Sequence, residues 1–209
     1  MEIKDTYTTI AQATDEIIFK EKSSKFFGYA YPIQSEDEVK PIIDILRKQH
    51  PHAVHYCYAY QIGTEKISYR ANDDGEPSNT AGAPIYGQIQ SFGLTNVLLV
   101  VVRIFGGIKL GVGGLITAYK TTAQMVLEEA EIIEKTIDIH FLISFDYKNM
   151  NKVMRVIKEK KLDIVTQTMG LEEDSGLALG KIEIKTRKKN AEMIFDIFDT
   201  LFEIEIKRL

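Results

Sequence analysis

The alternation of apolar and polar positions predicts a chain of short strands and amphipathic helices. At its centre, residues 96–104 form a nearly unbroken β-branched run, which is typical of a strand buried on both faces of a sheet. Apolar residues then recur at helical spacing over 115–130, so a helix follows this strand. By the same reasoning, strands are expected at 17–20, 25–33, 53–62 and 66–70, and helices at 35–47 and 81–91.

The start of the first helix carries a local signal of its own. Ser35 and Glu38 have the spacing of a capping box, in which each side chain accepts a hydrogen bond from the backbone of the other residue. Pro41 lies far enough into the predicted helix to cost a backbone hydrogen bond. We therefore expect a helix here whose first turn is distorted or begins late.

The last third of the chain has a different order of elements. Strands are expected at 137–146, 162–169, 178–186 and 203–207, with helices at 150–157 and 194–201 and a turn at 172–176. This βαββαβ order is the ferredoxin-like plan, with Phe141 and Phe145 in the core. A charged segment at 131–135 is interpreted as the turn between two domains, 1–133 and 134–209. The predicted fold class is α+β.

A dense polar segment, Asp73-Asp74-Gly75-Glu76-Pro77-Ser78-Asn79-Thr80-Ala81-Gly82, has the composition of a surface loop. We call it the acidic loop. Asp73, Asp74 and Glu76 carry hard oxygen ligands that could hold a magnesium ion together with a phosphate. Glu76 could instead act as a general base for Ser78 or Thr80. The structural alternative is a capped turn, in which Ser78 or Thr80 caps the helix that follows.

A second segment, Phe105-Gly106-Gly107-Ile108-Lys109-Leu110-Gly111-Val112-Gly113-Gly114, joins the central strand to the next helix. We call it the glycine loop. Its five glycines are Gly106, Gly107, Gly111, Gly113 and Gly114. They leave amide groups uncovered at a positive helix end, which suits an anion, although the spacing fits neither the nucleoside-triphosphate loop nor the dinucleotide fingerprint. Lys109 could add a point charge to a phosphate; alternatively, the glycines permit a close strand-to-helix crossing and Lys109 is solvated.

His55 and Cys57 share one face of the predicted strand at 53–62, and His52 lies nearby. A metal site is one interpretation of this group. Zinc normally takes three or four ligands at tight spacing, however, and one cysteine with two histidines is more typical of a half-buried strand edge. We therefore interpret the group as structural and keep His55 as a candidate site residue.

The two loops and their flanks form a long, ordered pattern. It comprises Asp73 to Ser78, Thr80 to Gly82 and Pro84, then Val101 to Arg103, Phe105 to Gly107, Lys109 to Gly111, Gly113 to Leu115, and Ala118 with Tyr119. This pattern closely resembles the signature of the Impact/YigZ family, in which a histidine matching His55 is typical. The resemblance implies an N-terminal domain with a ribosomal-protein-like βαβ fold, a ferredoxin-like C-terminal domain and a link to translation.

At two positions the chain lacks a basic residue that is usual in the family pattern. Ala83 replaces a basic residue usual before the proline, and Thr117 replaces an arginine usual in the Gly-Gly-Leu-x-Arg-Ala-Tyr string. If the family site binds phosphate through those cations, this chain binds it more weakly or uses Lys109, Arg103 and Lys120 instead.

The composition of the chain favours some classes of protein over others. The 209 residues carry a formal net charge of -4 and a pI near 5.7, whereas a general nucleic-acid binder usually has a large basic face. Basic clusters at 158–161 and 185–189 are interpreted as solvated faces, with RNA contact as the alternative. A single cysteine, with no signal peptide and no apolar run long enough to span a bilayer, predicts a cytoplasmic protein.

Two function hypotheses remain open. The first is a non-catalytic, translation-associated regulatory protein that docks on a protein, ribosomal or RNA partner and needs no cofactor. The second is a phosphate-ligand or nucleotide-binding enzyme, with or without magnesium, in which the acidic loop faces the glycine loop across a cleft. The second requires that the two loops converge. The sequence identifies neither the partner nor the oligomeric state.

Overall fold

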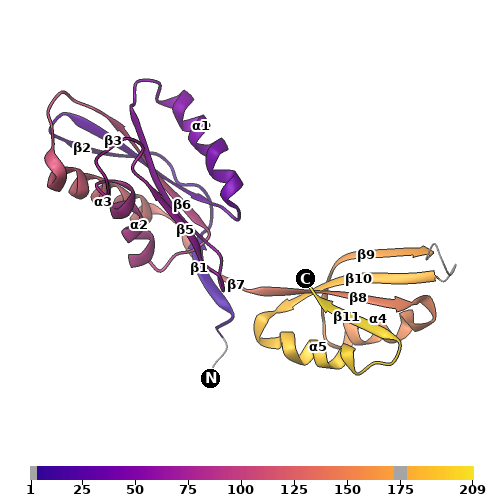
Figure 1. The fold of residues 1–209 in the computed structure, drawn as a ribbon. Coiled ribbons are helices and arrows are strands. Elements are labelled where there is room, and N and C mark those ends of the chain that lie inside the picture. Colours follow the sequence, from indigo (N-terminus) through magenta and orange to yellow (C-terminus); the bar gives the residue numbers. More distant parts are fainter. Residues whose placement is uncertain (1–3, 172–177) are drawn as a thin grey trace. The chain divides into compact units, whose positions relative to one another are not determined.

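The structure is a computed structural model that describes residues 4–171 and 178–209. The chain forms two compact units (Figure 1). One comprises Tyr7–Lys135, and the other comprises Thr136–Leu209 together with the N-terminal residues up to Thr6. No helix of the described residues is long and apolar enough to cross a membrane.

The first unit is built on a five-stranded antiparallel sheet with the strand order β2-β3-β6-β4-β5. The strands are β2 (Ile17–Glu21), β3 (Ser24–Pro32), β4 (His55–Ile62), β5 (Ser68–Asn72) and β6 (Val97–Ile104). The β-branched run forms the central strand, β6, and every residue from Val97 to Arg103 is buried. The predicted strands and their hairpin are therefore confirmed.

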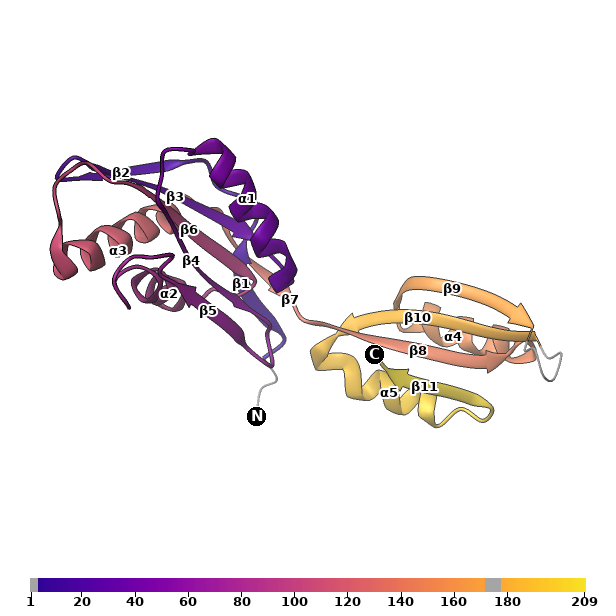
Figure 2. The same ribbon diagram turned by 45° about the horizontal axis from the view of Figure 1, so that its top comes forward.

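Helices cover both faces of this sheet (Figures 1 and 2). α1 (Val39–Gln49) lies on one face, and α2 (Gly82–Ser91) and α3 (Gly111–Glu129) lie on the other. Successive β6 side chains point to opposite faces, so Leu99 and Val101 enter the core under α2 and α3, whereas their neighbours enter the core under α1. This is why odd-numbered and even-numbered positions of the central strand are both apolar.

The start of α1 follows the capping signal and also shows the cost of its proline. Ser35 and Glu38 form the predicted capping box around a short 3-10 helix, Glu36–Glu38. The α-helix itself begins at Val39. This later start places Pro41 in the first helical turn, where no backbone N–H is needed for an intrahelical hydrogen bond.

The charged segment predicted as an interdomain turn is a strand instead. β7 (Ile132–Thr136) pairs with β1 (Thr6–Ile10) in a two-stranded sheet. Its side chains alternate between exposed and half-buried positions, so Glu134 reaches solvent from a regular strand. The strand β1 lies more than a hundred positions away in the chain. The charge pattern of residues 131–135 therefore could not predict this pairing.

The second unit contains β8 (Asp138–Asp146), α4 (Met150–Glu159), β9 (Asp163–Leu171), β10 (Ala178–Arg187), α5 (Ala191–Asp199) and β11 (Ile204–Arg208), with single 3-10 turns at Tyr147–Asn149 and Lys188–Asn190. Its antiparallel sheet has the order β11-β8-β10-β9, and α4 and α5 cover one face. Phe141 and Phe145 are buried in this core, as predicted. The turn predicted at 172–176 lies outside the described residues.

Candidate functional site

The acidic loop and the glycine loop meet at one pocket of about 410 Å³ in the first unit. Its wall is formed by His55, Glu76, Pro77, Arg103, Phe105, Lys109, Leu110, Gly111, Val112 and Leu115. The structure thus brings together five of the candidate residues from three separate parts of the sequence. The size lies within the range of ordinary small-molecule sites.

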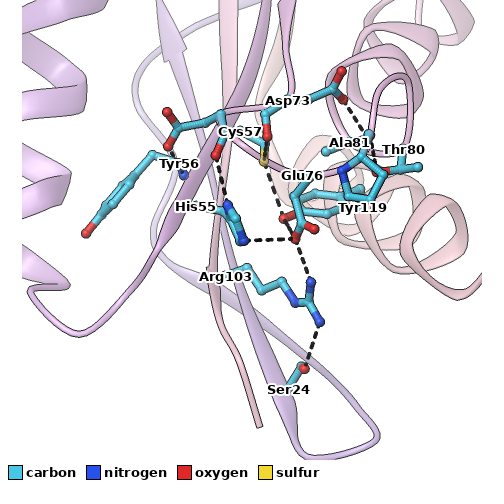
Figure 3. Close-up of polar contacts among 12 residues, drawn as sticks. Ser24, His55, Tyr56, Cys57, Asp73, Glu76, Thr80, Ala81, Arg103 and Tyr119 are labelled. Carbon is cyan, nitrogen blue, oxygen red and sulfur yellow. Dashed lines mark hydrogen bonds and ion pairs between the residues drawn. The ribbon is translucent and has the colours of Figure 1, made fainter. Parts of the chain in front are cut away.

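A buried ion pair lies at this pocket (Figure 3). The Arg103 guanidinium donates to Glu76 Oε1 over 2.6 Å, and the Tyr119 hydroxyl donates to the same oxygen over 2.8 Å. The side chains of Glu76 and Arg103 are only 4% and 6% exposed. Burial raises the pKa of Tyr119 well above its ordinary range, so this phenol keeps its proton and remains a donor.

Sheet register explains why Arg103 lies where it does. It is the penultimate residue of β6, directly opposite Phe26 on β3 and His55 on β4. Residues opposite one another in adjacent strands project to the same face. Arg103 Cζ therefore lies 5.5 Å from the ring centroids of both Phe26 and Phe105, and the guanidinium is held between aromatic rings while it pairs with Glu76.

His55 contacts the acidic loop at two points. Its Nδ1 lies 2.8 Å from the backbone oxygen of Asp74, and its Nε2 lies 3.9 Å from Glu76 Oε1. Because a carbonyl oxygen only accepts, Nδ1 carries the proton in this contact. The second ring nitrogen is left facing Glu76 at the pocket wall.

The three carboxylates predicted as magnesium ligands do not converge. Asp73 accepts hydrogen bonds from the backbone N–H groups of Ala81 and Gly82 at 2.9 and 2.8 Å. Asp74 accepts one from the Tyr56 N–H at 2.7 Å, and Glu76 pairs with Arg103. Within residues 4–171 and 178–209, no three His, Cys, Asp or Glu side chains gather as a metal site. This geometry corrects the prediction that the three carboxylates together hold a magnesium ion.

The cap of α2 also differs from the prediction. Asp73, eight residues before Ala81, supplies the oxygen that Ser78 or Thr80 was expected to supply. The Thr80 hydroxyl donates instead to the backbone oxygen of Pro77 at 2.6 Å, and Ser78 is exposed. The loop folds back on itself and brings a distant carboxylate to the helix start. Neither hydroxyl lies at the pocket wall beside Glu76.

Cys57 belongs to the packing beneath the site. It is fully buried, and its Sγ lies 3.0 Å from the backbone oxygen of Asp73 and 3.3 Å from the Tyr119 hydroxyl. Burial raises the pKa of this thiol above its ordinary range, so the thiolate needed for nucleophilic attack or metal binding is disfavoured. The structural interpretation of Cys57 agrees with this geometry.

The glycine loop is shorter than predicted, because α3 begins at Gly111 rather than at residue 115. Gly113 and Gly114 therefore lie in its first turn. A Cβ added to Gly106 would lie 2.1 Å from the carbonyl group of Ser23, so this glycine permits the close crossing. Gly107 adopts a positive φ of 86°, a conformation that favours glycine. Lys109 is exposed at the pocket, whereas Lys120 is exposed elsewhere along α3.

Two parts of the site were not predicted as such. Tyr119 was predicted only as an apolar position of its helix and as part of the family pattern, although its hydroxyl reaches Glu76. The rim of the pocket is apolar at Phe105 and Val112, which are 48% and 60% exposed. Large apolar residues within a glycine-rich segment were the signal in the sequence that could have predicted this rim.

Comparison with known proteins places these features in a family. The profile of the Impact N-terminal domain matches residues 22–127, a range that contains both loops and the ion pair. The chain belongs to the Impact family. It is 36% identical over 156 residues to the IMPACT family member YvyE of Bacillus subtilis, covering 75% of this chain and 71% of that protein.

Other relatives agree with this assignment. The IMPACT family member YigZ of Escherichia coli is 30% identical over 146 residues, covering 69% of this chain and 72% of that protein. The crystal structure of a hypothetical protein superposes on this Impact-family chain with a TM-score of 0.73 at 21% identity, over 99% of this chain and 98% of the other. That similarity extends the shared fold to both units.

Proposed function

We propose that this Impact-family protein is a cytoplasmic regulator without a reaction of its own, and that it docks on a protein component of the translation machinery through the pocket and its rim. The link to translation rests on the family resemblance. The observation that carries the docking site is the apolar rim. Phe105 and Val112 line one concave site and are about half exposed or more, and exposed apolar patches mark interaction surfaces.

The polar groups below the rim support binding. Glu76 accepts hydrogen bonds from Arg103 and Tyr119 and is held in place. A rigid, paired floor of this kind gives a docking pocket a fixed shape. A protein partner is favoured over RNA, because the rim is apolar and the chain has a formal net charge of -4.

We also propose two domains, 1–133 and 134–209, which follow the two units except at the residues up to Thr6 and at residues 134–135. In the second unit, the sheet order β11-β8-β10-β9 places the first and third strands at the centre, which supports a ferredoxin-like domain. The first unit is assigned the ribosomal-protein-like βαβ fold that the family resemblance implies. The docking residues all belong to the first domain.

The test is comigration with ribosomes and ribosomal subunits on a sucrose gradient. The double variant Phe105→Ser, Val112→Ser removes the rim, and Ile18→Ser, Ile45→Ser is the matched control, because those side chains are 46% and 61% exposed elsewhere in the same unit. We expect the rim variant to bind about tenfold more weakly or worse and the control to behave as the unaltered protein. Equal comigration of both variants contradicts the docking site.

A further inference from the structure

The two helices of the second unit form one layer. α4 and α5 cover the same face of its sheet (Figure 2). The Lys152 ammonium at the start of α4 donates to the backbone oxygen of Phe202 over 3.2 Å, and the Lys148 ammonium lies 2.9 Å from the Glu203 carboxylate. The start of α4 therefore lies beside the turn that follows α5, and the two helices run side by side in opposite directions.

The exposed side of α4 is basic. Lys152, Arg155 and Lys158 follow one another at three-residue spacing, which places them on one side of the helix. The apolar side of the same helix is buried in the core. Arg155 pairs with Glu159 in the next turn at 3.9 Å, with the two side chains 70% and 63% exposed, and such a pair contributes little. Lys158 has no ion-pair partner among the described residues.

The exposed side of α5 is acidic. Glu192, Asp196 and Asp199 are spaced by four and three residues, so they also share one side of their helix. All three are exposed, and α5 contains no basic residue. Glu192 lies 3.9 Å from Arg208 and is 80% exposed. Within residues 4–171 and 178–209, Asp196 and Asp199 have no ion-pair partner.

The basic row and the acidic row do not neutralise each other inside one chain. No ion pair of the described residues joins α4 to α5. A second copy turned about a two-fold axis presents its α5 to the α4 of the first copy and its α4 to the α5, so each basic row meets an acidic row and the contact occurs twice. Residues 136–209 carry equal numbers of basic and acidic residues, so little net charge opposes this approach.

Exposed apolar side chains belong to the same layer. Met193 on α5 is 49% exposed, and Phe202, in the turn after α5, is 79% exposed. Exposed ion pairs contribute little by themselves, and apolar area removed from water supplies the larger part of an association free energy. The charges select the partner, because α5 repels a polyanion such as RNA and α4 repels a polycation. A second copy of the chain satisfies both helices.

We propose that the protein forms a two-fold symmetric homodimer in which α4 of each copy packs against α5 of the other, with Arg155 and Lys158 facing Asp196 and Asp199. The inference goes beyond the proposed function, because the docking pocket belongs to the first unit. Each dimer therefore carries two docking pockets.

Sedimentation velocity of the full chain, over a series of protein concentrations, tests the dimer. Arg155→Glu with Lys158→Glu makes both helices acidic, and Asp196→Lys with Asp199→Lys makes both helices basic. Each change occurs twice in a symmetric contact, so either double variant should dimerise at least about tenfold more weakly than the unaltered protein. An equimolar mixture of the two double variants should form a heterodimer, because two acidic helices then meet two basic ones.

Lys181→Glu with Lys207→Glu is the matched control, because it reverses two charges on β10 and β11 of the same unit. Those side chains point away from the helices, since their neighbours Ile182 and Ile206 lie in the core. This variant should dimerise within about twofold of the unaltered protein. Circular dichroism checks that each variant is folded. The unaltered dimer should weaken in about 1 M sodium chloride, where the screening length falls to about 3 Å.

Three results overturn the inference. They are a single monomeric species at about 100 μM protein, an equal effect of the helix variants and the control, and two monomeric double variants whose mixture does not dimerise. If a double variant does not fold, the salt series of the unaltered protein decides, and a dimer that high salt leaves unchanged overturns the inference.

Discussion

The guanidinium of Arg103 and the carboxylate of Glu76 meet at 2.6 Å although they lie 27 positions apart in the chain. One comes from the end of a central strand and the other from an irregular loop, and the Tyr119 hydroxyl closes the contact from α3. This pair joins the sheet, the acidic loop and the helix that begins at the pocket. Its geometry therefore controls both the stability of the first unit and the shape of the site.

Removing Glu76 should be strongly destabilising. Glu76→Ala leaves the Arg103 charge buried without a partner, which typically costs about 3–5 kcal/mol of unfolding free energy. Glu159→Ala is the matched control, because its ion pair with Arg155 at 3.9 Å is 63% exposed on the glutamate side and should contribute about 1 kcal/mol or less. Urea denaturation measures both values. Similar losses in the two variants would show that the buried pair is energetically unimportant.

Removing Asp73 should weaken the start of α2. Asp73→Ala deletes the acceptor for the Ala81 and Gly82 N–H groups, and we expect a loss of about 1–2 kcal/mol. Asp73→Asn keeps an oxygen acceptor and should cost less. Ser78→Ala removes an exposed hydroxyl from the same loop and should lie within about 0.5 kcal/mol of the unaltered protein. A larger loss for Ser78→Ala would argue that the hydroxyl is the cap after all.

Alanine substitutions at two glycines of the glycine loop should have opposite effects on stability. Gly106→Ala forces a Cβ to within 2.1 Å of the Ser23 carbonyl group and should destabilise by about 1–3 kcal/mol. Gly113→Ala meets open space inside a helical turn and should stabilise by about 0.4–1 kcal/mol, because the unfolded chain loses freedom. Thermal unfolding of both variants checks the contrast. Destabilisation by Gly113→Ala would contradict the open geometry.

Stability should fall at alkaline pH through Tyr119. Burial raises the pKa of this phenol in the folded state above its ordinary value of 10.0. Below pH 10 both states hold the proton, so Tyr119 adds no pH dependence there. Above pH 10 the unfolded chain releases a proton that the folded protein keeps, so the unfolding free energy declines by about 1.4 kcal/mol per pH unit for this group.

The variant Tyr119→Phe tests that assignment. It loses the hydrogen bond to Glu76 at every pH, so it should be less stable than the unaltered protein at neutral pH. Above pH 10, however, its unfolding free energy should decline less steeply than that of the unaltered protein. Cys57, whose pKa burial raises above its ordinary value of 9.0, adds a similar decline that begins earlier, and Cys57→Ala separates the two. Parallel pH curves for Tyr119→Phe and the unaltered protein would contradict the assignment.

Local patterns determined most of the elements. The β-branched run identified β6, the Ser35 and Glu38 pair identified the 3-10 turn that leads into α1, and alternation identified β8 in the second unit. Each of these signals depends on neighbours within one turn or along one strand. The strand β7 was missed because its short charged run becomes regular only when β1 pairs with it.

The candidate site depends on the tertiary structure to a greater degree. By itself, the sequence determined that a polar loop precedes the helix before the central strand, that a glycine-rich loop follows this strand, and that Arg103 and Lys109 carry charge there. Only the fold decided that Asp73 caps α2, that Glu76 pairs with Arg103, and that Lys109 lines the pocket beside them. The physical reason is that residue type fixes which partners a carboxylate accepts, whereas sheet order, register and loop closure decide which donor is within reach.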